Sequence, residues 1–351
     1  MSSVLITGGS GFIGGYMCDR LSAAGHRVSV LDLARPRRQT GGLRFVQGDV
    51  RDAQAVRTAL EGCDSVMHLA AAHHDFGIAP STYFDVNEGG SRVLLQELDR
   101  AGITRACFYS SVAVYERTPE PRCEDSDPLP TGPYGRSKLA AESLFRRWVE
   151  RGEGRRVLIM RPSVVFGPGN YANMFALMRQ IHSRMYLPIG RGTNIKSMAY
   201  VENLVDATLF LWARQDLPSF DIYNYVDVPN LTSREICEVI ANALGRSAPT
   251  RSVPLGLALA LAMPFDFAIR LTGRNLPISS QRIRKLATAS TNFEAEKVQR
   301  AGFAPRVPLS EGIYRMARWF LAEGNRHRLV RDLPPERAAS ALTTAPRAAG
   351  A

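Results

Sequence analysis

The eight residues "TGGSGFIG", at positions 7–14, stand between two segments of different character. The short aliphatic run "SVLIT" before them is typical of a buried strand, and the apolar residues after them recur at helical spacing. A strand, a glycine-rich turn and a helix in this order let the backbone approach a pyrophosphate, whose charge the helix N-terminus stabilises. The stretch therefore predicts a dinucleotide-binding turn, and the residues expected at the cofactor are Gly8, Gly11, Phe12, Ile13 and Gly14.

A carboxylate ends the second predicted strand, "HRVSVLDL", because Asp32 follows Gly14 by 18 residues. A carboxylate in this place accepts hydrogen bonds from both ribose hydroxyls and repels a 2′-phosphate. We therefore predict NAD rather than NADP as the cofactor. Arg35, Arg37 and Arg38 follow directly and would weaken that preference.

Strands and helices alternate outward from this turn. The runs "LRFVQGDV", "SVMHLAA", "RACFYSS" and "RRVLIMRP" predict further strands, with helical segments such as "AQAVRTALEG" between them. This order predicts an α/β fold with a doubly wound parallel sheet of six or seven strands, the Rossmann arrangement, and a smaller, partly inserted α/β substrate domain. The predicted division is 1–168 plus 195–228 for NAD, 169–194 plus 229–322 for the substrate, and 323–351 as a disordered, Ala-rich tail.

The pentapeptide "YGRSK", residues 134–138, places a phenol and an ammonium one helical turn apart. A tyrosine accepts a proton from an alcohol near neutral pH only if its pKa, near 10, is lowered. A lysine at i+4 on the same helix face supplies the positive charge that lowers it. After a dinucleotide turn, the spacing indicates Tyr134 as the catalytic base and Lys138 as its partner.

These motifs together give the chain a resemblance to the extended short-chain dehydrogenase/reductase family, in its branch of nucleotide-sugar epimerases and dehydratases. The resemblance covers about residues 3–320 and includes "GDV", "HLAA", "VNEGG", "SSVAVY", "RPSVVFGPG" and "YVENLVDA". It implies that Ser111 hydrogen-bonds the reacting hydroxyl and that Lys138 also holds the nicotinamide ribose. Further cofactor contacts implied by the matching motifs are Asp49, Val50, Leu69, Ala70, Ala71, Asn87, Tyr134 and Lys138.

The resemblance also narrows the reaction. Dehydratases of the family carry an Asp–Glu pair where this chain has Val112 and Ala113, and neither side chain exchanges a proton. The 3,5-epimerising reductases need a Cys–His pair, whereas Cys107 lies within a predicted strand. What remains is oxidation of a sugar C4 hydroxyl, followed either by return of the hydride, which gives 4-epimerisation, or by net dehydrogenation.

For the substrate, the resemblance implies a nucleotide sugar, with UDP-sugars as the expected class. Asn173 and Lys196 match the positions that hold a diphosphate, and Arg282 is a further candidate phosphate ligand. His73 follows the "HLAA" segment toward the expected sugar pocket, where Ser111 also contacts substrate. Val164 and Glu116 depart from the family pattern of Asn and Gly.

Two other functions stay open on the sequence. "RPSVVFGPG", "YVEN" and an apolar helix after Pro254 are also similar to hydroxysteroid and sterol dehydrogenases. Such an enzyme would need no diphosphate clamp. A non-catalytic NAD-binding scaffold is the third reading, against which the complete set of Ser111, Tyr134 and Lys138 argues.

Charge and composition bound the setting. The net charge of +11 is compatible with phosphorylated substrates, and the dispersed basic residues without interleaved aromatics argue against nucleic acid. Five scattered cysteines predict neither a disulfide framework nor a metal site, and the N-terminus lacks the pattern of a signal peptide. We expect a cytoplasmic protein, and the family resemblance implies a homodimer through the helices near 87–101 and 137–151.

The most apolar stretch begins at Pro254. Pro264 and Asp266 are expected to interrupt it before the roughly 20 residues that a bilayer requires. No transmembrane segment is therefore predicted. The stretch is read as a helix that either packs on the core or touches a membrane surface.

Overall fold

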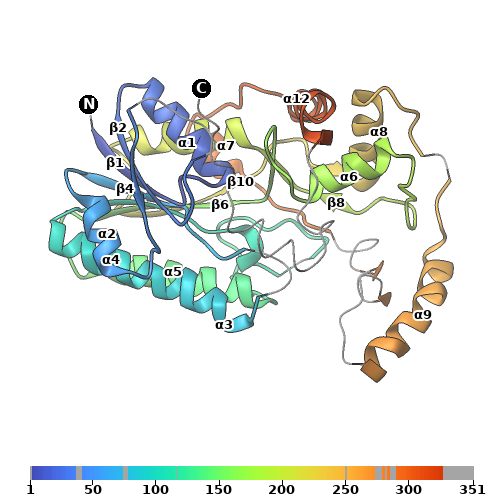
Figure 1. The fold of residues 1–351 in the computed structure, drawn as a ribbon, viewed down its shortest axis with the longest axis horizontal. Coiled ribbons are helices and arrows are strands. Elements are labelled where there is room, and N and C mark those ends of the chain that lie inside the picture. The colour runs from blue at the N-terminus through green and yellow to red at the C-terminus, as the bar shows by residue number, and fades with distance from the viewer. Residues whose placement is uncertain are drawn as a thin grey trace, which may run out of the picture.

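The structure is a computed structural model, which describes residues 2–36, 42–73, 78–116, 118–249, 251–272, 279–280, 283–284 and 290–326. Its centre is a parallel sheet of seven strands in the order β10-β6-β5-β4-β1-β2-β3 (Figure 1). The strands are β1 (Ser3–Thr7), β2 (Arg27–Asp32), β3 (Arg44–Gln47), β4 (Ser65–His68), β5 (Arg105–Tyr109), β6 (Arg156–Pro162) and β10 (Phe220–Tyr225). The doubly wound parallel sheet predicted from the sequence is confirmed.

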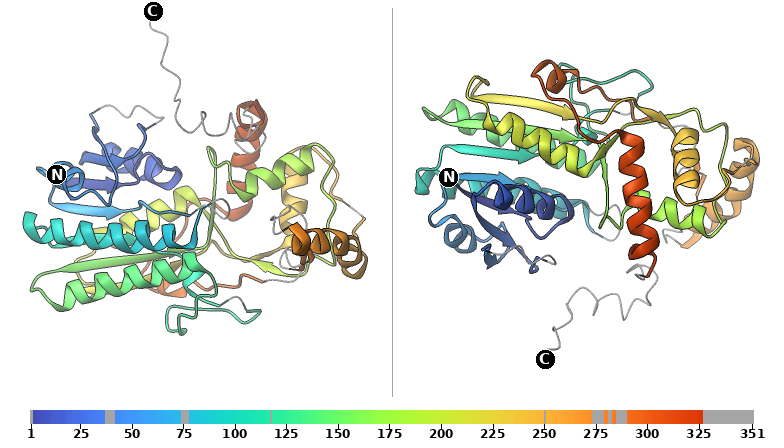
Figure 2. Two further views of the ribbon diagram at one scale, coloured as in Figure 1. Left: turned by 60° about the horizontal axis from the view of Figure 1, so that its bottom comes forward. Right: turned by 90° about the horizontal axis from the view of Figure 1, so that it is seen from above.

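Helices cover both faces of the sheet (Figure 2). One buried apolar cluster joins the sheet to α1 (Phe12–Ala23) and α7 (Val201–Ala213). A second cluster on the opposite face joins it to α2 (Ala53–Leu60), α4 (Gly90–Ala101) and α5 (Pro133–Glu150). Because all strands run parallel, their carboxyl ends meet at one edge, where such sheets bind ligands.

A third apolar core lies beyond that edge. It joins the helices α6 (Asn173–His182), α8 (Ser233–Ala243) and α12 (Leu309–Ala322). Small strand pairs accompany it: β7 (Val164–Phe166) with β9 (Met198–Tyr200), and β8 (Ile195–Lys196) with β11 (Leu231–Thr232). The remaining short elements are α3 (Pro80–Tyr83), η1 (Phe84–Gly89), η2 (Val112–Val114), α11 (Glu296–Arg300) and η3 (Gly324–Arg326). These segments give the proposed substrate domain a core of its own, while its boundaries stay a prediction.

The apolar stretch after Pro254 forms the helix α9 (Leu255–Thr272), and the expected interruption at Pro264 is wrong. Proline has no backbone N–H, so the carbonyl oxygen of Ala260, four residues before Pro264, loses its helical hydrogen bond. Ala260 is exposed, so water can reach this carbonyl. Among the described residues, no helix combines the length and the hydropathy that crossing a membrane would need. The tail predicted for 323–351 lies outside the described residues from 327 onward.

Candidate active site

The glycine-rich turn leaves no room for side chains between β1 and α1. Gly8 has a φ of +72°, and a Cβ there would lie 2.7 Å from the backbone nitrogen of Ala70. A Cβ on Gly14 would lie 2.2 Å from the carbonyl oxygen of Gly8. The turn therefore brings the N-terminus of α1 against the segment that follows β4, and Phe12 and Ile13 begin that helix. A backbone-lined N-terminus of this kind fits the pyrophosphate of a dinucleotide.

Asp32 faces the same turn. One carboxylate oxygen accepts a hydrogen bond from the backbone nitrogen of Ser10 at 3.0 Å, and the other accepts from Ala34 at 3.3 Å. The carboxylate is thus fixed at the carboxyl end of β2, beside the glycines. This position suits the ribose of NAD, so the residues present fit the cofactor that the sequence predicts.

The remaining predicted cofactor residues line the next strand ends. Asp49 follows β3 and pairs with Arg51 at 2.6 Å, and the hydrogen bonds from Arg51 hold the pKa of the Asp49 carboxyl below its usual value. Val50 beside it is buried against α4, where a Cβ on Gly90 would meet its side chain at 2.5 Å. Leu69, Ala70 and Ala71 follow β4.

The three predicted catalytic residues come from two elements that press together. Tyr134 and Lys138 lie one turn apart on α5, and Ser111 caps the short turn η2, where its Oγ accepts from the backbone nitrogen of Ala113 at 3.1 Å. A Cβ on Gly135 would lie only 2.1 Å from the carbonyl oxygen of Ala113. The glycine therefore lets the start of α5 close onto the turn that carries Ser111.

Lys138 is held at the end of the neighbouring strand. Its side chain is 2% exposed, and Nζ donates to the carbonyl oxygen of Tyr109, the last residue of β5, at 2.8 Å. Burial disfavours the ammonium and lowers the pKa of Lys138 to about 7, against the opposing effect of Glu142. The lysine therefore titrates close to neutral pH.

Glu142, one turn beyond Lys138, belongs to a buried ion pair that the sequence analysis missed. Its carboxylate accepts two hydrogen bonds from Arg161 of β6, at 2.9 and 2.5 Å, and both side chains are 4% exposed. Arg161 also donates to the hydroxyl of Tyr115 at 2.5 Å. The spacing of Lys138 and Glu142 could have pointed to Glu142, because residues four apart lie on the same face of a helix and the acid is therefore close to the lysine.

A chain of hydrogen bonds connects the glycine turn with the other side of the site. Thr7 contacts His68 Nδ1 at 2.6 Å, and His68 Nε2 contacts Ser91 at 3.1 Å. Because the Ser91 hydroxyl donates to the carbonyl oxygen of Asn87 at 2.5 Å, His68 donates from Nε2 and accepts at Nδ1. Complete burial keeps this imidazole neutral, with a pKa lowered to about 3.

Asn87 continues this chain toward the catalytic helix. It lies in the π-helical turn η1, a feature frequent at functional sites. Its amide bonds both backbone groups of Ala72, at 2.8 and 3.1 Å, and donates to Ser137 at 2.9 Å. The Ser137 hydroxyl in turn donates to the carbonyl oxygen of Tyr134 at 2.8 Å. Asn87 thus ties the segment after β4 to the start of α5.

The predicted substrate residues are more dispersed. Asn173 is the exposed first residue of α6, and Lys196 is a half-buried residue of β8, which pairs with β11. His73 is exposed after β4, with Nδ1 3.3 Å from the carbonyl oxygen of Ala71. Arg282 lies outside the described residues. Whether these side chains meet a substrate stays a prediction.

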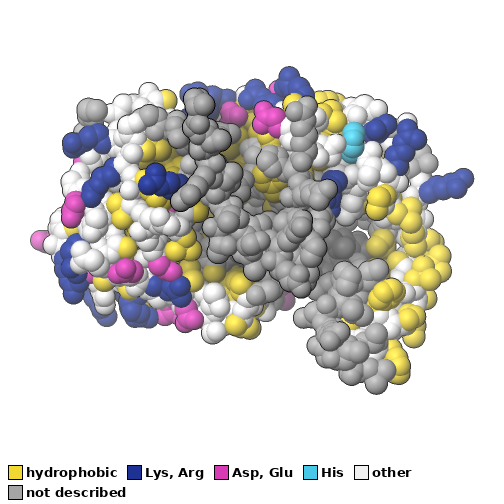
Figure 3. Space-filling view, in the orientation of Figure 1, with side chains coloured by type: hydrophobic (Ala, Val, Ile, Leu, Met, Phe, Trp, Pro, Cys, Tyr) yellow, Lys and Arg dark blue, Asp and Glu magenta, His cyan; other side chains and the backbone are white. Residues whose placement is uncertain are grey.

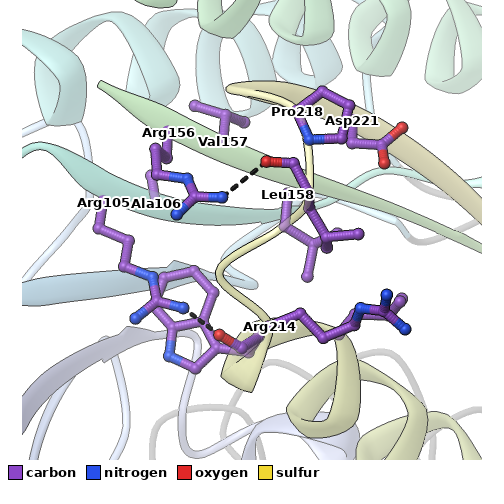
Figure 4. Close-up of a pocket in the computed structure, with 11 residues that line it drawn as sticks. Arg105, Ala106, Arg156, Val157, Leu158, Arg214, Pro218 and Asp221 are labelled. Atoms are coloured by element: carbon purple, nitrogen blue, oxygen red, sulfur yellow. Dashed lines mark hydrogen bonds between the residues drawn. The ribbon is translucent and has the colours of Figure 1, made fainter. Parts of the chain in front are cut away.

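A small hollow lies at the opposite edge of the sheet, around the first residues of β5 and β6 (Figure 4). Arg105 donates there to the carbonyl oxygen of Trp212, and Arg156 donates to that of Leu217 at 2.6 Å. Its volume is about 30 Å³, which suits water rather than a nucleotide. The arginines close the amino-terminal edge of the sheet, and the glycine turn, which is the predicted dinucleotide site, lies at the carboxyl edge.

The chain is similar in sequence to known proteins. Residues 4–225 match the family described as "NAD dependent epimerase/dehydratase family". The chain is 35% identical over 314 residues to the N-acetyl-α-D-glucosaminyl-diphospho-ditrans,octacis-undecaprenol 4-epimerase of Escherichia coli O157:H7, covering 89% of this chain and 93% of the relative. It is 29% identical over 287 residues to the UDP-glucose 4-epimerase of Lacticaseibacillus casei, covering 72% and 84%.

Solved structures show the same architecture. The structure of MoeE5 in complex with UDP-glucose and NAD has a TM-score of 0.73 at 25% identity, and the match covers 91% of this chain and 98% of that one. The Thermus thermophilus UDP-glucose 4-epimerase has a TM-score of 0.72 at 24% identity, with 92% and 99% covered.

The fold and the site define an NAD-dependent enzyme of the Rossmann type. More particularly, the chain belongs to the NAD-dependent epimerase/dehydratase family. The predictions of the family, of an enzyme of the isomerase class and of NAD as its cofactor are thereby confirmed.

Proposed function

We propose that this protein is a 4-epimerase of a sugar attached to a diphosphate. The proposal is supported by the set of Tyr134, Lys138 and Ser111, because α5 and η2, which carry these residues, pack against each other at Gly135 and Ala113. Val112 and Ala113 beside Ser111 offer no acid or base for expelling water. Reversible oxidation of one carbinol is what these residues support.

Tyr134 acts as the base in the proposed mechanism. Its phenolate accepts the proton of the sugar hydroxyl at C4, and Lys138 stabilises the phenolate by its positive charge. The Ser111 oxygen accepts from Ala113, so its own proton can donate to the reacting sugar oxygen. Tyr134 returns the proton when the ketone is reduced from its other face. NAD, when bound along the glycine turn and Asp32, supplies the reversible hydride acceptor.

The diphosphate is proposed to bind beside α6 and β8. An Asn at the start of a helix presents an amide near backbone N–H groups, and Lys196 adds a point charge. Relatives differ in the group that is attached to the diphosphate on the side away from the sugar, since one acts on an undecaprenol-linked sugar and another on UDP-glucose. The proposal therefore specifies a sugar diphosphate ester, on a nucleotide or a polyprenol.

The test is direct. Purified protein is incubated with UDP-glucose, UDP-N-acetylglucosamine and a short polyprenyl-diphosphate N-acetylglucosamine, and product stereochemistry and NADH absorbance are followed. Inversion at C4 without net NADH supports the proposal. Accumulating NADH with a ketone product would instead identify a dehydrogenase.

The second candidate function is a sterol-type dehydrogenase. The chain is 25% identical over 348 residues to a 3β-hydroxysteroid-dehydrogenase/decarboxylase of Arabidopsis thaliana. Lys196→Ala separates the two functions, because an apolar alcohol needs no diphosphate contact and its turnover would keep the same KM. A sugar-diphosphate epimerase would show a raised KM.

Two properties of the whole protein complete the proposal. The described cysteines Cys18, Cys63, Cys107, Cys123 and Cys237 are all unpaired, which suits a reducing cytoplasm. A homodimer is proposed through α5, whose outward stripe of Arg136, Leu139, Ala140 and Ser143 borders a broad groove.

A further inference from the structure

The helix α9 buries two alanines and leaves five of its large apolar side chains exposed. Ala258 and Ala262, one turn apart, are 5% and 0% exposed and face the protein. Leu255, Leu259 and Ile269 are half-buried. Five other large apolar side chains of the helix are 38% to 66% exposed; they are Leu257, Leu261, Met263, Phe265 and Phe267. A helix that packed on the core would show the opposite pattern.

This surface is set apart from the dinucleotide-binding sheet. Figure 1 shows α9 standing away from the body of the molecule, and Figure 3 shows hydrophobic side chains gathered over it. Isolated apolar side chains on a surface are ordinary, but five large ones on one helix mark an interaction surface.

A second exposed apolar segment adjoins the start of α9. Met185 is 78% and Leu187 is 55% exposed, in the loop after α6. Val253, just before α9, exchanges backbone hydrogen bonds with Pro188 and Gly190 at 2.9 Å each. The loop and the helix are therefore fixed to one another at this end of the molecule.

The charge of this part of the chain is strongly positive. Between Arg246 and Ser290 the sequence carries seven basic residues and a single acid, Asp266. Asp266 accepts from the backbone nitrogen of Ser280 at 3.1 Å, so its carboxylate is engaged within the protein. An uncovered apolar helix within a cationic segment is the combination that binds an anionic lipid surface.

We propose that the outer face of α9 lies in the interface of an anionic bilayer, so that the protein binds membranes peripherally. The biological role of this binding rests on the proposed function, since membrane binding would bring the active site to a sugar diphosphate that is attached to a polyprenol in the bilayer. The exposed apolar side chains enter the acyl boundary, and the net positive charge of the sequence from Arg246 to Ser290 attracts the anionic headgroups. A protein partner fits this surface less well. The rim of a protein–protein interface is polar and usually carries charges of both signs, whereas this segment carries almost only positive charge.

Sedimentation with lipid vesicles tests the proposal. The full chain is mixed with vesicles of phosphatidylcholine alone or with added phosphatidylglycerol. Binding is expected to the anionic vesicles and to weaken with salt. The double variant Leu261→Asp with Phe267→Asp should lower the partitioning of the protein onto vesicles by at least about tenfold. It removes two apolar groups that would be buried in the lipid, and it adds two negative charges that the anionic headgroups repel.

The matched control is the double variant Tyr314→Asp with Leu321→Asp, which places the same two charges at apolar side chains of α12 that are 39% and 45% exposed. It should bind vesicles like the wild type. Equal binding of the α9 double variant and the wild type would overturn the proposal. Loss of self-association in the α9 variant without change in vesicle binding would also overturn it, in favour of a second copy as the occupant.

Activity separates this inference from the proposed function. The α9 double variant should keep wild-type turnover of a UDP-sugar in solution, and should lose turnover of a polyprenyl-linked sugar in vesicles. Absence of any epimerisation in the wild type would reject the proposed function, whereas vesicle binding would still decide the role of α9.

Discussion

Tyr134 is the residue on which the proposed chemistry depends. Tyr134→Phe keeps the ring and its edge contact with Tyr83, whose centroid lies 6.1 Å away, but removes the group that takes the proton. We expect kcat to fall by about 10²–10⁴-fold with little change in KM. Steady-state kinetics on the active sugar measures this, and Tyr83→Phe serves as the control. A variant with unaltered kcat would show that another group accepts the proton.

Lys138 gives the stability of the cofactor-free protein a defined pH dependence. Its pKa is lowered from 10.5 to about 7 by burial, so between these values the unfolded chain binds a proton that the folded protein does not. The free energy of unfolding therefore rises with pH across this window, on the order of 1 kcal/mol per pH unit, and the gain is lost as pH falls toward 7.

Lys138→Met should remove this contribution. Denaturant unfolding at several pH values between 7 and 10 measures it as the difference between the two proteins, so that other titrating groups cancel. Parallel stability curves for variant and wild type would contradict the buried, partly neutral lysine.

Among the elements, the turn between β1 and α1 has the strictest steric requirement. Gly14→Ala would place a methyl group 2.2 Å from the Gly8 carbonyl oxygen and 2.7 Å from the Gly9 Cα. We expect a loss of about 1–3 kcal/mol in the free energy of unfolding and weaker NAD binding, because backbone must move. Chemical denaturation and NAD titration measure the two effects.

The neighbouring glycine supplies the matched control. A Cβ on Gly15 would meet no atom within 4 Å, and this residue lies inside α1. Gly15→Ala should therefore stabilise the helix by up to about 1 kcal/mol and leave NAD binding unchanged. If Gly14→Ala and Gly15→Ala had the same effect on stability and NAD binding, the close contact of Gly14 with the turn would not be the reason that position 14 requires glycine.

Local patterns predicted the glycine turn before α1 and the helix that carries Tyr134 and Lys138. The glycine spacing and the Tyr–Lys spacing each report contacts within one or two turns of chain, so sequence alone locates them. The outer strand β10 was not located, because its run "FDIYNY" mixes polar and apolar residues. His68, Ser91 and Glu142 were missed for a different reason: their partners are brought together only by the sheet, across 19 to 61 residues.

In the whole molecule, α5 has one buried face, which carries the predicted catalytic lysine, and another face toward the surface. Its buried side carries Lys138 and Glu142, and its outward stripe includes Ala140. Ala140→Glu would bring two like charges together across a homodimer interface that uses this stripe. We expect the wild type to sediment as a dimer and the variant to sediment as a monomer at the same protein concentration.

Ala23→Glu is the control for this measurement. Ala23 ends α1, which packs on the opposite face of the sheet from α5, and it is exposed. The same charge there should leave the sedimentation coefficient unaltered. A dimeric Ala140→Glu protein would place the interface elsewhere.

A chain of hydrogen bonds from Thr7 through His68, Ser91 and Asn87 to Ser137 connects the predicted cofactor turn with the start of α5, which carries Tyr134. We therefore expect that removing a hydroxyl from this chain alters both the glycine turn and the position of Tyr134. Laboratory evolution for tighter NAD retention and for faster turnover should consequently converge on the same few positions, so that neither trait is tuned without moving the other.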